Sequence, residues 1–301
     1  MFQHVESFCA YLLKEKRYSP HTINAYKTDI GQFVEYCQST YEINELKSIK
    51  HTIVRSWIVA RMEFGDIEKS INRKISSLRN FFQYQKRKGR IDKSPMLKIV
   101  APKIPKRLPE FIREESLAKL FDTLNESDSY SSLRDRIIVE LLYSTGIRRA
   151  ELISIKETDI KFQDGLLKVI GKGNKERLIP LNDILMHKLK KLIELKDEKW
   201  ENASAFIFLT DKGKKVYPKF VYNKVLALLS TVSTSKKKSP HILRHSFATH
   251  LTNNGADINA IKELLGHSNL AATQIYTHNS ITKLKEVYSK SHPKAKGKRK
   301  S

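Results

Sequence analysis

A cluster of prolines divides the chain into two parts. Residues 90–109 hold four of the nine prolines, together with several lysines. Proline removes a backbone donor and blocks helix formation, so this stretch favours an extended linker. The sequence therefore predicts two domains, over 1–89 and 110–291, each large enough to bury its own core. Residues 292–301 are short, basic and typical of a disordered tail.

Apolar residues recur at helical spacing at four places in the first domain. The predicted helices cover 2–16, 20–37, 52–61 and 66–88. Ser19 followed by Pro20 is a typical cap and first-turn pair. Asp66 is the expected cap of the fourth helix, and Gly89 is its expected end.

The second domain is predicted to be mainly α-helical with a small antiparallel sheet. Strands are expected at 166–170 and 177–181, on either side of a GKGNK turn, and 205–209 is a candidate third strand. The predicted helices cover 131–143, 240–255, 257–265 and 280–290. The fold class expected for the whole chain is mainly α with one small sheet.

Charge gives the first indication of function. Lys and Arg total 56 against 32 Asp and Glu, a formal net charge of +24. Such a surplus attracts polyanions, and nucleic acid is favoured because each neutralised phosphate releases counterions. An anionic membrane surface is disfavoured because no helix sets a broad aromatic-rich apolar face opposite its lysines. A basic protein without such a partner is the bland alternative.

The fourth predicted helix carries basic residues along much of its length. A basic helix in a basic protein is a candidate DNA contact, and the residues assigned to that role are Arg73, Lys74 and Arg79. The alternative is that some of these side chains only form a solvated face.

Membrane and secretion signals are not found in the sequence. It has no run of about 18 apolar residues, and its beginning lacks the basic and apolar regions of a signal peptide. Cys9 and Cys37 lie inside predicted helices, where they are expected to be small buried hydrophobes rather than a disulfide or a metal pair. A cytoplasmic location is expected.

Two residues at the start of a predicted helix suit a phosphate. His241 and Arg244 project from neighbouring points of one helix face, in the first turn, where free N–H groups favour an anion. A zinc helix is the competing interpretation, because His241 and His245 are four apart. It is disfavoured because such a motif needs Glu after the first His, and the sequence has Ile242.

Two further basic residues lie at turns. Arg148 follows Gly146, and an arginine can bind two phosphate oxygens at once. Glu151 could orient this guanidinium or simply pair with it. Lys172 lies in the GKGNK turn, which is not a P-loop because it joins two strands. This lysine could donate a proton in a DNA groove or be an ordinary turn residue.

The last motif holds a histidine and a tyrosine. His267 follows a helix-ending glycine, and Tyr276 lies nine residues later, where a core aromatic is the alternative. Taken with the arginines, these residues suit phosphoryl transfer. Tyr276 would attack phosphorus and the two arginines would neutralise the phosphate oxygens. Lys172 would protonate the leaving 5′ oxygen, and the two histidines would assist proton transfer.

Four stretches, in this order, closely resemble the tyrosine recombinases, and the layout of the chain resembles the Xer branch of that family. They are STGIRRAELISI, VIGKGNKERLIPL, SPHILRHSFATHL and LLGHSNLAATQIYTH. The six active-site positions of the family match Arg148, Lys172, His241, Arg244, His267 and the nucleophile Tyr276. The resemblance implies an N-terminal core-binding domain and a C-terminal catalytic domain that clamp DNA, without metal or other cofactor.

The resemblance also implies partners and a biological role. The substrate would be a double-stranded DNA recombination site, cut through a 3′-phosphotyrosyl intermediate and exchanged through a Holliday junction. The enzyme would act as a homotetramer or with a related recombinase, and its last helix would dock on a neighbouring subunit. The Xer branch implies resolution of chromosome dimers at cell division, with a division-site DNA translocase as a candidate regulator.

Other functions fit part of the pattern. A mobile-element integrase would share the chemistry. A non-catalytic architectural DNA-binding protein would explain the charge but leave the six residues as coincidence. A metal-dependent nuclease is disfavoured because the sequence lacks a convincing carboxylate cluster. A relaxing topoisomerase is disfavoured by the compact layout.

Overall fold

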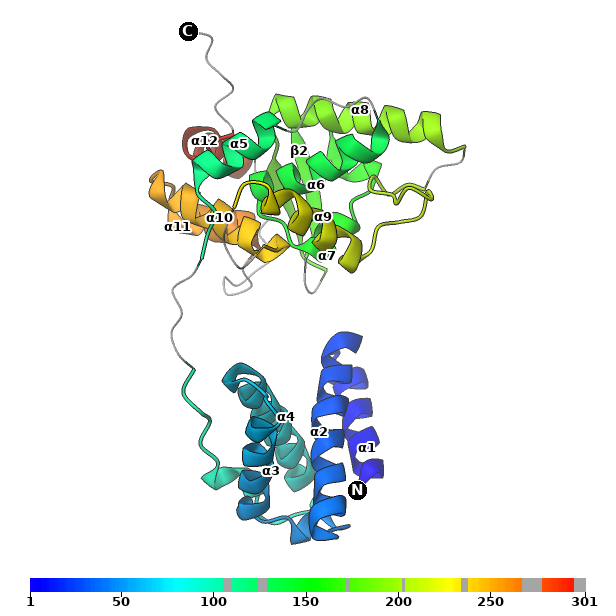
Figure 1. The fold of residues 1–301 in the computed structure, drawn as a ribbon, viewed down its shortest axis with the longest axis vertical. Helices are drawn as coiled ribbons and strands as arrows, with labels where there is room; N and C mark the ends of the chain where they lie inside the picture. The colour runs from blue at the N-terminus through cyan, green and yellow to red at the C-terminus, as the bar shows by residue number, and fades with distance from the viewer. Residues whose placement is uncertain are drawn as a thin grey trace. The chain divides into compact units, whose positions relative to one another are not determined.

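The chain divides into two compact units, Met1–Arg107 and Leu108–Ser301, called here the N-terminal and C-terminal units (Figure 1). The computed structural model describes residues 1–104, 110–123, 129–171, 174–201, 204–233, 238–266 and 278–294.

Four helices build the N-terminal unit, as the periodicity predicts. They are α1 (Phe2–Lys14), α2 (Pro20–Tyr41), α3 (His51–Glu63) and α4 (Glu68–Arg87), with a short 3-10 turn at Leu46–Ser48. The Ser19 hydroxyl accepts a hydrogen bond from the backbone N–H of Thr22, so the predicted cap of α2 is confirmed. Gly89 follows α4 with a φ of 66°, which confirms that helix end.

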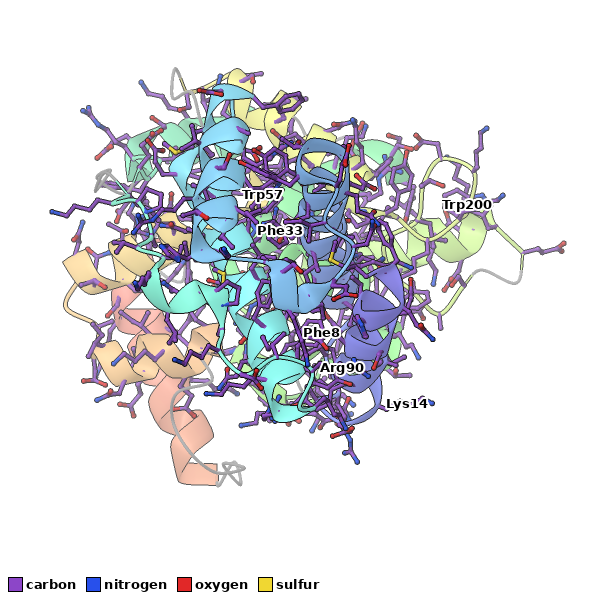
Figure 2. The ribbon with its side chains drawn as sticks, turned by 90° about the horizontal axis from the view of Figure 1, so that it is seen from below. Phe8, Lys14, Phe33, Trp57, Arg90 and Trp200 are labelled. Carbon is purple, nitrogen blue, oxygen red and sulfur yellow. The ribbon has the colours of Figure 1, made fainter. Side chains whose placement is uncertain are left out.

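Aromatic side chains fill the core of the N-terminal unit (Figure 2). Phe8, Phe33 and Trp57 are buried, and the rings of Phe33 and Trp57 meet edge to face with centroids 5.2 Å apart. Cys9 and Cys37 are also buried in this core as free thiols. Burial of each large apolar side chain contributes about 2 kcal/mol, so these helices are held mainly by their shared apolar faces.

Two details of this unit differ from the sequence interpretation. Asp66 does not cap α4, because its carboxylate accepts a hydrogen bond from Arg61 Nε at 2.7 Å and the capping position belongs to Ile67. The predicted linker is also shorter, because Pro95–Lys98 forms a 3-10 turn and Met96 is buried in the N-terminal core. Part of the segment is therefore packed rather than extended.

The C-terminal unit is mainly helical with one three-stranded antiparallel sheet, which confirms the predicted fold class. Its helices are α5 (Glu114–Thr123), α6 (Tyr130–Thr145), α7 (Arg149–Ile153), α8 (Asp183–Lys199), α9 (Pro218–Ser230), α10 (Pro240–Asn253), α11 (Ile258–Leu265) and α12 (His278–Ser291). Helix α6 is buried almost throughout and packs against α8, α9 and α10 (Figure 1). Helix α7 also contacts α6, and α11 and α12 pack against α10 and against β3 (Glu176–Pro180).

The sheet runs in the order β1–β2–β3, from Ile160–Lys161, Leu166–Ile170 and Glu176–Pro180. Residue pairs such as Val169 with Arg177 fix the register of β2 and β3. The candidate strand at 205–209 was wrong, because that segment forms only isolated bridges. Its backbone pairs briefly with residues 155–157 and with Val216. The Leu209 N–H instead donates to the Tyr130 hydroxyl at 2.8 Å, so the pairing does not continue as a strand.

The chain remains packed beyond the point where the sequence predicted a tail. His292 is fully buried, with its ring stacked on Tyr288 at a centroid distance of 5.0 Å. Lys294 Nζ donates to Glu140 Oε1 at 2.7 Å. The expected disordered tail therefore does not begin at 292, because ring packing and a buried ion pair hold the chain through Lys294. Residues 295–301 lie outside the described residues.

Candidate active site

Gly146 allows the end of α6 to pack closely against α10 and α11. Gly146 ends α6 with a φ of 61°, in the left-handed region. A Cβ atom built there would lie 2.5 Å from the Phe247 ring and 2.8 Å from the Leu265 side chain. Only glycine fits this close contact with α10 and with the end of α11. The turn after Gly146 then places Arg148 at the N-cap of α7.

Arg148 is held at three points. Its backbone N–H donates to Glu151 Oε2 at 2.7 Å, and its Nη1 donates to Glu151 Oε1 at 2.8 Å. Its Nη2 donates to the carbonyl of Gly266 at 3.0 Å. The side chain is 35% exposed, so the guanidinium is fixed on one side and open to solvent on the other. The predicted partnership between Arg148 and Glu151 is confirmed.

Arg244 joins Arg148 at the end of α11. It lies in the first turns of α10, and its Nη2 donates to the Leu265 carbonyl at 2.6 Å. Its Nη1 donates to the carbonyl of Gly146. Burial, and then the positive charge of Arg148, lowers the pKa of Arg244 to about 10. The guanidinium therefore stays charged at neutral pH in a site that already concentrates positive charge.

His241 also lies where the sequence placed it. It is in the first turn of α10, directly after Pro240, and its side chain is exposed. His241 and Arg244 thus share the N-terminal part of one helix, and Arg148 reaches the same region from α7. Lys172, His267 and Tyr276 lie outside the described residues, so their predicted roles stay predictions.

The sequence analysis missed Arg177, a buried arginine on β3 that is 4% exposed. Its Nη1 and Nη2 donate to the two oxygens of Glu151 at 3.0 and 2.8 Å, and its Nε donates to the Leu264 carbonyl at 2.9 Å. Strand alternation was the available signal, because Arg177 shares its inward face with Ile179. Burial raises the pKa of Glu151, but Arg177 and Arg148 more than offset this and hold it below its ordinary value.

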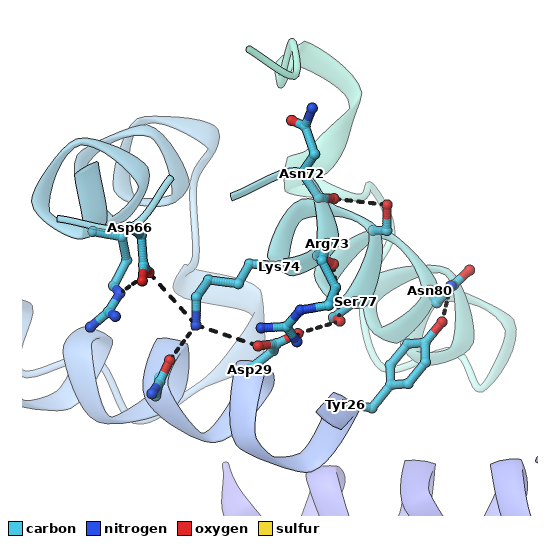
Figure 3. A network of polar contacts seen from close by, with 11 residues as sticks. Tyr26, Asp29, Asp66, Asn72, Arg73, Lys74, Ser77 and Asn80 are labelled. Atoms are coloured by element: carbon cyan, nitrogen blue, oxygen red, sulfur yellow. Dashed lines mark hydrogen bonds and ion pairs between the residues drawn. The ribbon is translucent and has the colours of Figure 1, made fainter. Parts of the chain in front are cut away.

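The three basic residues singled out on α4 have different environments, and Figure 3 shows two of them, Arg73 and Lys74. Lys74 is buried, and its ammonium lies 3.4 Å from Asp29 Oδ1. Arg73 donates to the same carboxylate but keeps its side chain 51% exposed. Arg79 is exposed and donates to the Ile99 carbonyl at 2.8 Å. Lys74 is therefore withdrawn as a candidate DNA contact, because it lies on the apolar face of its helix.

The described residues hold neither a candidate metal site nor a candidate membrane-spanning helix. In that part of the chain, no group of three or more His, Cys, Asp or Glu side chains could hold a metal ion. No helix within the same ranges has both the length and the apolar character needed to cross a bilayer.

Comparisons with known proteins identify the family. Residues 110–283 match the model described as the phage integrase family, and residues 5–89 match the phage integrase N-terminal SAM-like domain. The chain belongs to the phage integrase family, that is, to the tyrosine recombinases.

Named relatives match almost the full chain. "Tyrosine recombinase XerC" of Chlorobaculum parvum is 34% identical, over 97% of this chain and 94% of the relative. "Tyrosine recombinase XerD" of Listeria monocytogenes is 35% identical, over 97% of this chain and 99% of the relative. A structure of XerH recombinase bound to a palindromic difH substrate has a TM-score of 0.72 at 23% identity, covering 96% of this chain and 84% of that one, and shows the shared fold.

Proposed function

We propose that this protein is a Xer-type site-specific recombinase that cuts and rejoins DNA through a 3′-phosphotyrosyl bond to Tyr276. The observation that carries this proposal is that two arginines, from the start of α7 and from α10, bind the end of α11. Arg148 and Arg244 bind adjacent carbonyls there, those of Gly266 and Leu265. Two fixed guanidiniums side by side suit one phosphate with charge on its non-bridging oxygens.

The reaction follows from the chemistry of these groups. The Tyr276 hydroxyl gives its proton to one of the two histidines, His241 or His267, and its oxygen attacks phosphorus, while the bond from phosphorus to the 5′ oxygen breaks. Lys172 gives a proton to the leaving 5′ oxygen, and Arg148 and Arg244 neutralise the transition state. His241 and His267 hold the phosphate or move protons. The phosphotyrosyl ester conserves the energy of the broken phosphodiester bond. A 5′ hydroxyl from another strand can therefore attack this ester, release Tyr276 and complete strand exchange.

Electrostatics supports DNA as the substrate. The net charge is +24, and Arg73 and Arg79 are exposed residues on α4. Phosphate contacts from such residues give affinity without sequence preference. We therefore assign DNA binding to both units, and we retain the N-terminal unit as the core-binding domain and the C-terminal unit as the catalytic domain.

The similarity to named relatives suggests the biological setting. Relatives called XerC and XerD match this chain about equally well, so both a homotetramer and a heterotetramer with a related recombinase remain within the proposal. We propose that the enzyme acts in the cytoplasm on a chromosomal site, that it resolves chromosome dimers through a Holliday junction at cell division, and that a DNA translocase regulates it.

Covalent trapping tests the proposed chemistry. Purified protein is mixed, in the presence of a chelator, with a nicked suicide substrate that carries a candidate chromosomal site, and the products are separated by denaturing electrophoresis. We expect a protein–DNA adduct with the native chain and none with Tyr276→Phe. Tight binding without an adduct in either protein would favour the non-catalytic architectural alternative. An adduct that persists in Tyr276→Phe would assign the nucleophile to another residue.

A further inference from the structure

Arg177 is a buried cation that the proposed chemistry does not use. Its side chain is 5% exposed, and its three described hydrogen bonds go to Glu151 and to the Leu264 carbonyl. Burial of a guanidinium costs desolvation free energy, which the attraction to a buried carboxylate often only offsets. The pair of Arg177 and Glu151 is therefore not explained by stability alone. The geometry of its partners indicates what else it does.

The first partner links Arg177 to Arg148. Arg177 binds both oxygens of Glu151 in a two-pronged contact, which fixes the plane of that carboxylate. Glu151 Oε1 also accepts from Arg148 Nη1 at 2.8 Å. The orientation of Arg148 therefore depends on a carboxylate that Arg177 holds in place.

The second partner links Arg177 to the end of α11. The last carbonyls of a helix lack partners within the helix and carry its negative dipole end. Three successive carbonyls, those of Leu264, Leu265 and Gly266, accept from Arg177, Arg244 and Arg148 respectively. The guanidinium of Arg177 also lies against Gly266, where an added Cβ would be 3.1 Å from its Nη1. Arg177 thus anchors the helix end on which the other two arginines rest.

We propose that Arg177 is a positioning residue for the strand-cleavage reaction, which holds Arg148 and Arg244 at the spacing of one phosphate without touching DNA. This inference rests on the function proposed above. A lysine would retain the charge, but it cannot bind both oxygens of Glu151 and the Leu264 carbonyl in one plane. The role therefore requires the guanidinium shape as well as its charge.

The test compares Arg177→Lys and Arg177→Gln with the native chain. Three quantities are measured on the full chain: the affinity for an uncleaved site, the rate of adduct formation on the nicked substrate at saturating protein, and the melting temperature. We expect both variants to form adduct about 100-fold more slowly, with DNA affinity changed less than about threefold, because the proposal gives Arg177 no phosphate contact.

Two further variants separate positioning from simple stability. Arg134 is another buried, ion-paired arginine of the same unit, and it donates to the Leu209 carbonyl at 2.9 Å. Arg134→Gln should lower the melting temperature but leave the adduct rate of the folded protein within about twofold. If Arg177 acts through Arg148, Arg177→Gln should add less than about threefold to the loss already caused by Arg148→Lys.

Each other outcome overturns a defined claim. Restoration of the native rate in Arg177→Lys would show that charge alone suffices. A full additional loss in the Arg148→Lys background would show that Arg177 does not act through Arg148. Failure of both Arg177 variants to fold would leave only a stabilising role and overturn the inference. Absence of an adduct with the native chain would instead overturn the proposed function, and this inference with it.

Discussion

Each unit of the molecule buries a carboxylate among basic side chains, and the two arrangements have different consequences. Asp29 on α2 accepts from Arg73 and from Ser77, and lies 3.4 Å from the Lys74 ammonium, with all three partners on α4. Its network joins α2 and α4, and extends through Lys74 to Asp66, 3.9 Å away, just before α4 (Figure 3). Glu151 instead binds arginines that reach beyond it to the backbone of α11. The first arrangement joins two helices, whereas the second also positions charged groups.

Burial of an ion pair does not by itself identify its role. Asp29 and Glu151 are both buried, at 0% and 6% exposure. What separates them is the kind of further contact that their partners make. Lys74 also meets the side chains of Gln32 and Asp66, whereas Arg148 and Arg177 donate to backbone carbonyls at the end of α11. Where a cation has other fixed partners, such as the carbonyls of a third element, its direction is determined as well as its charge, and preorganised charge is what phosphoryl transfer requires.

The largest expected effect is the loss of adduct formation when Arg244 is replaced. Arg244→Gln should reduce the rate of adduct formation by about 1000-fold, because a fixed donor to the developing phosphate charge is lost. The rate is measured by quenching the nicked-substrate reaction at saturating protein. Arg73→Gln is the matched change in the N-terminal unit and should leave this rate within about twofold. Equal losses in the two variants would erase the distinction between the two networks.

Asp29→Asn should act on stability instead. It removes the nearer carboxylate from the buried Lys74 ammonium, which keeps Gln32 and the more distant Asp66, at 3.9 Å, as partners. Removal of one partner of a buried pair costs about 3 kcal/mol. The chain has two tryptophans, Trp57 and Trp200. In a Trp200→Phe background the fluorescence of Trp57 therefore reports on the N-terminal unit. Urea unfolding is compared in this background with and without Asp29→Asn. A tenfold fall in the adduct rate of the folded variant would contradict a purely stabilising role.

The C-terminal unit should lose stability as pH falls below neutrality. Burial lowers the pKa of His292 from 6.5 to about 3, so the folded protein keeps this ring neutral while the unfolded chain takes up a proton below pH 6.5. The contribution of the neutral His292 ring to the free energy of unfolding is complete above pH 6.5. It falls by about 1.4 kcal/mol per pH unit between pH 6.5 and pH 3. Urea unfolding of Trp57→Phe, followed by Trp200 fluorescence at several pH values, measures the slope.

His292→Phe is the control for this pH dependence. It should flatten the dependence between pH 4 and 6 but leave a remainder, because burial also lowers the pKa of His250. An unchanged slope in His292→Phe would assign the effect to other groups.

The smallest expected effect concerns DNA affinity. Arg73→Gln should weaken binding about fivefold and reduce the salt dependence of log K by about one, as expected for one phosphate contact. Lys74→Gln should leave the salt dependence unchanged, because its ammonium is buried beside Asp29. Binding titrations at several salt concentrations distinguish these outcomes. Equal salt slopes for the native chain and Arg73→Gln would remove Arg73 from the DNA contact surface.

Local signals in the sequence predicted much of the fold. Ser19 caps α2 and Gly266 ends α11, each as a short-range pattern indicates. The strand at 166–170 was also predicted with its observed bounds. These features depend on hydrogen bonds between residues a few positions apart, which is why a single sequence reveals them.

Features that depend on tertiary packing were not predictable in the same way. The contact from Arg177 to Leu264 joins residues 87 positions apart, and that from Arg148 to Gly266 joins residues 118 apart. The burial of Lys74 depends on which side of α4 meets α2, and the burial of His292 depends on rings from α6 and α12. Motif composition indicated the chemistry of Arg148 and Arg244, but it did not indicate the residue that holds them.

The three arginine contacts at the end of α11 constrain the length of this helix. Successive carbonyls of a helix are displaced by about 1.5 Å and rotated by about 100°. One inserted or deleted residue within Ile258–Leu265 would turn those carbonyls away from Arg177, Arg244 and Arg148. During evolution, substitutions on the exposed face of α11 should therefore be tolerated, while changes in its length should be eliminated.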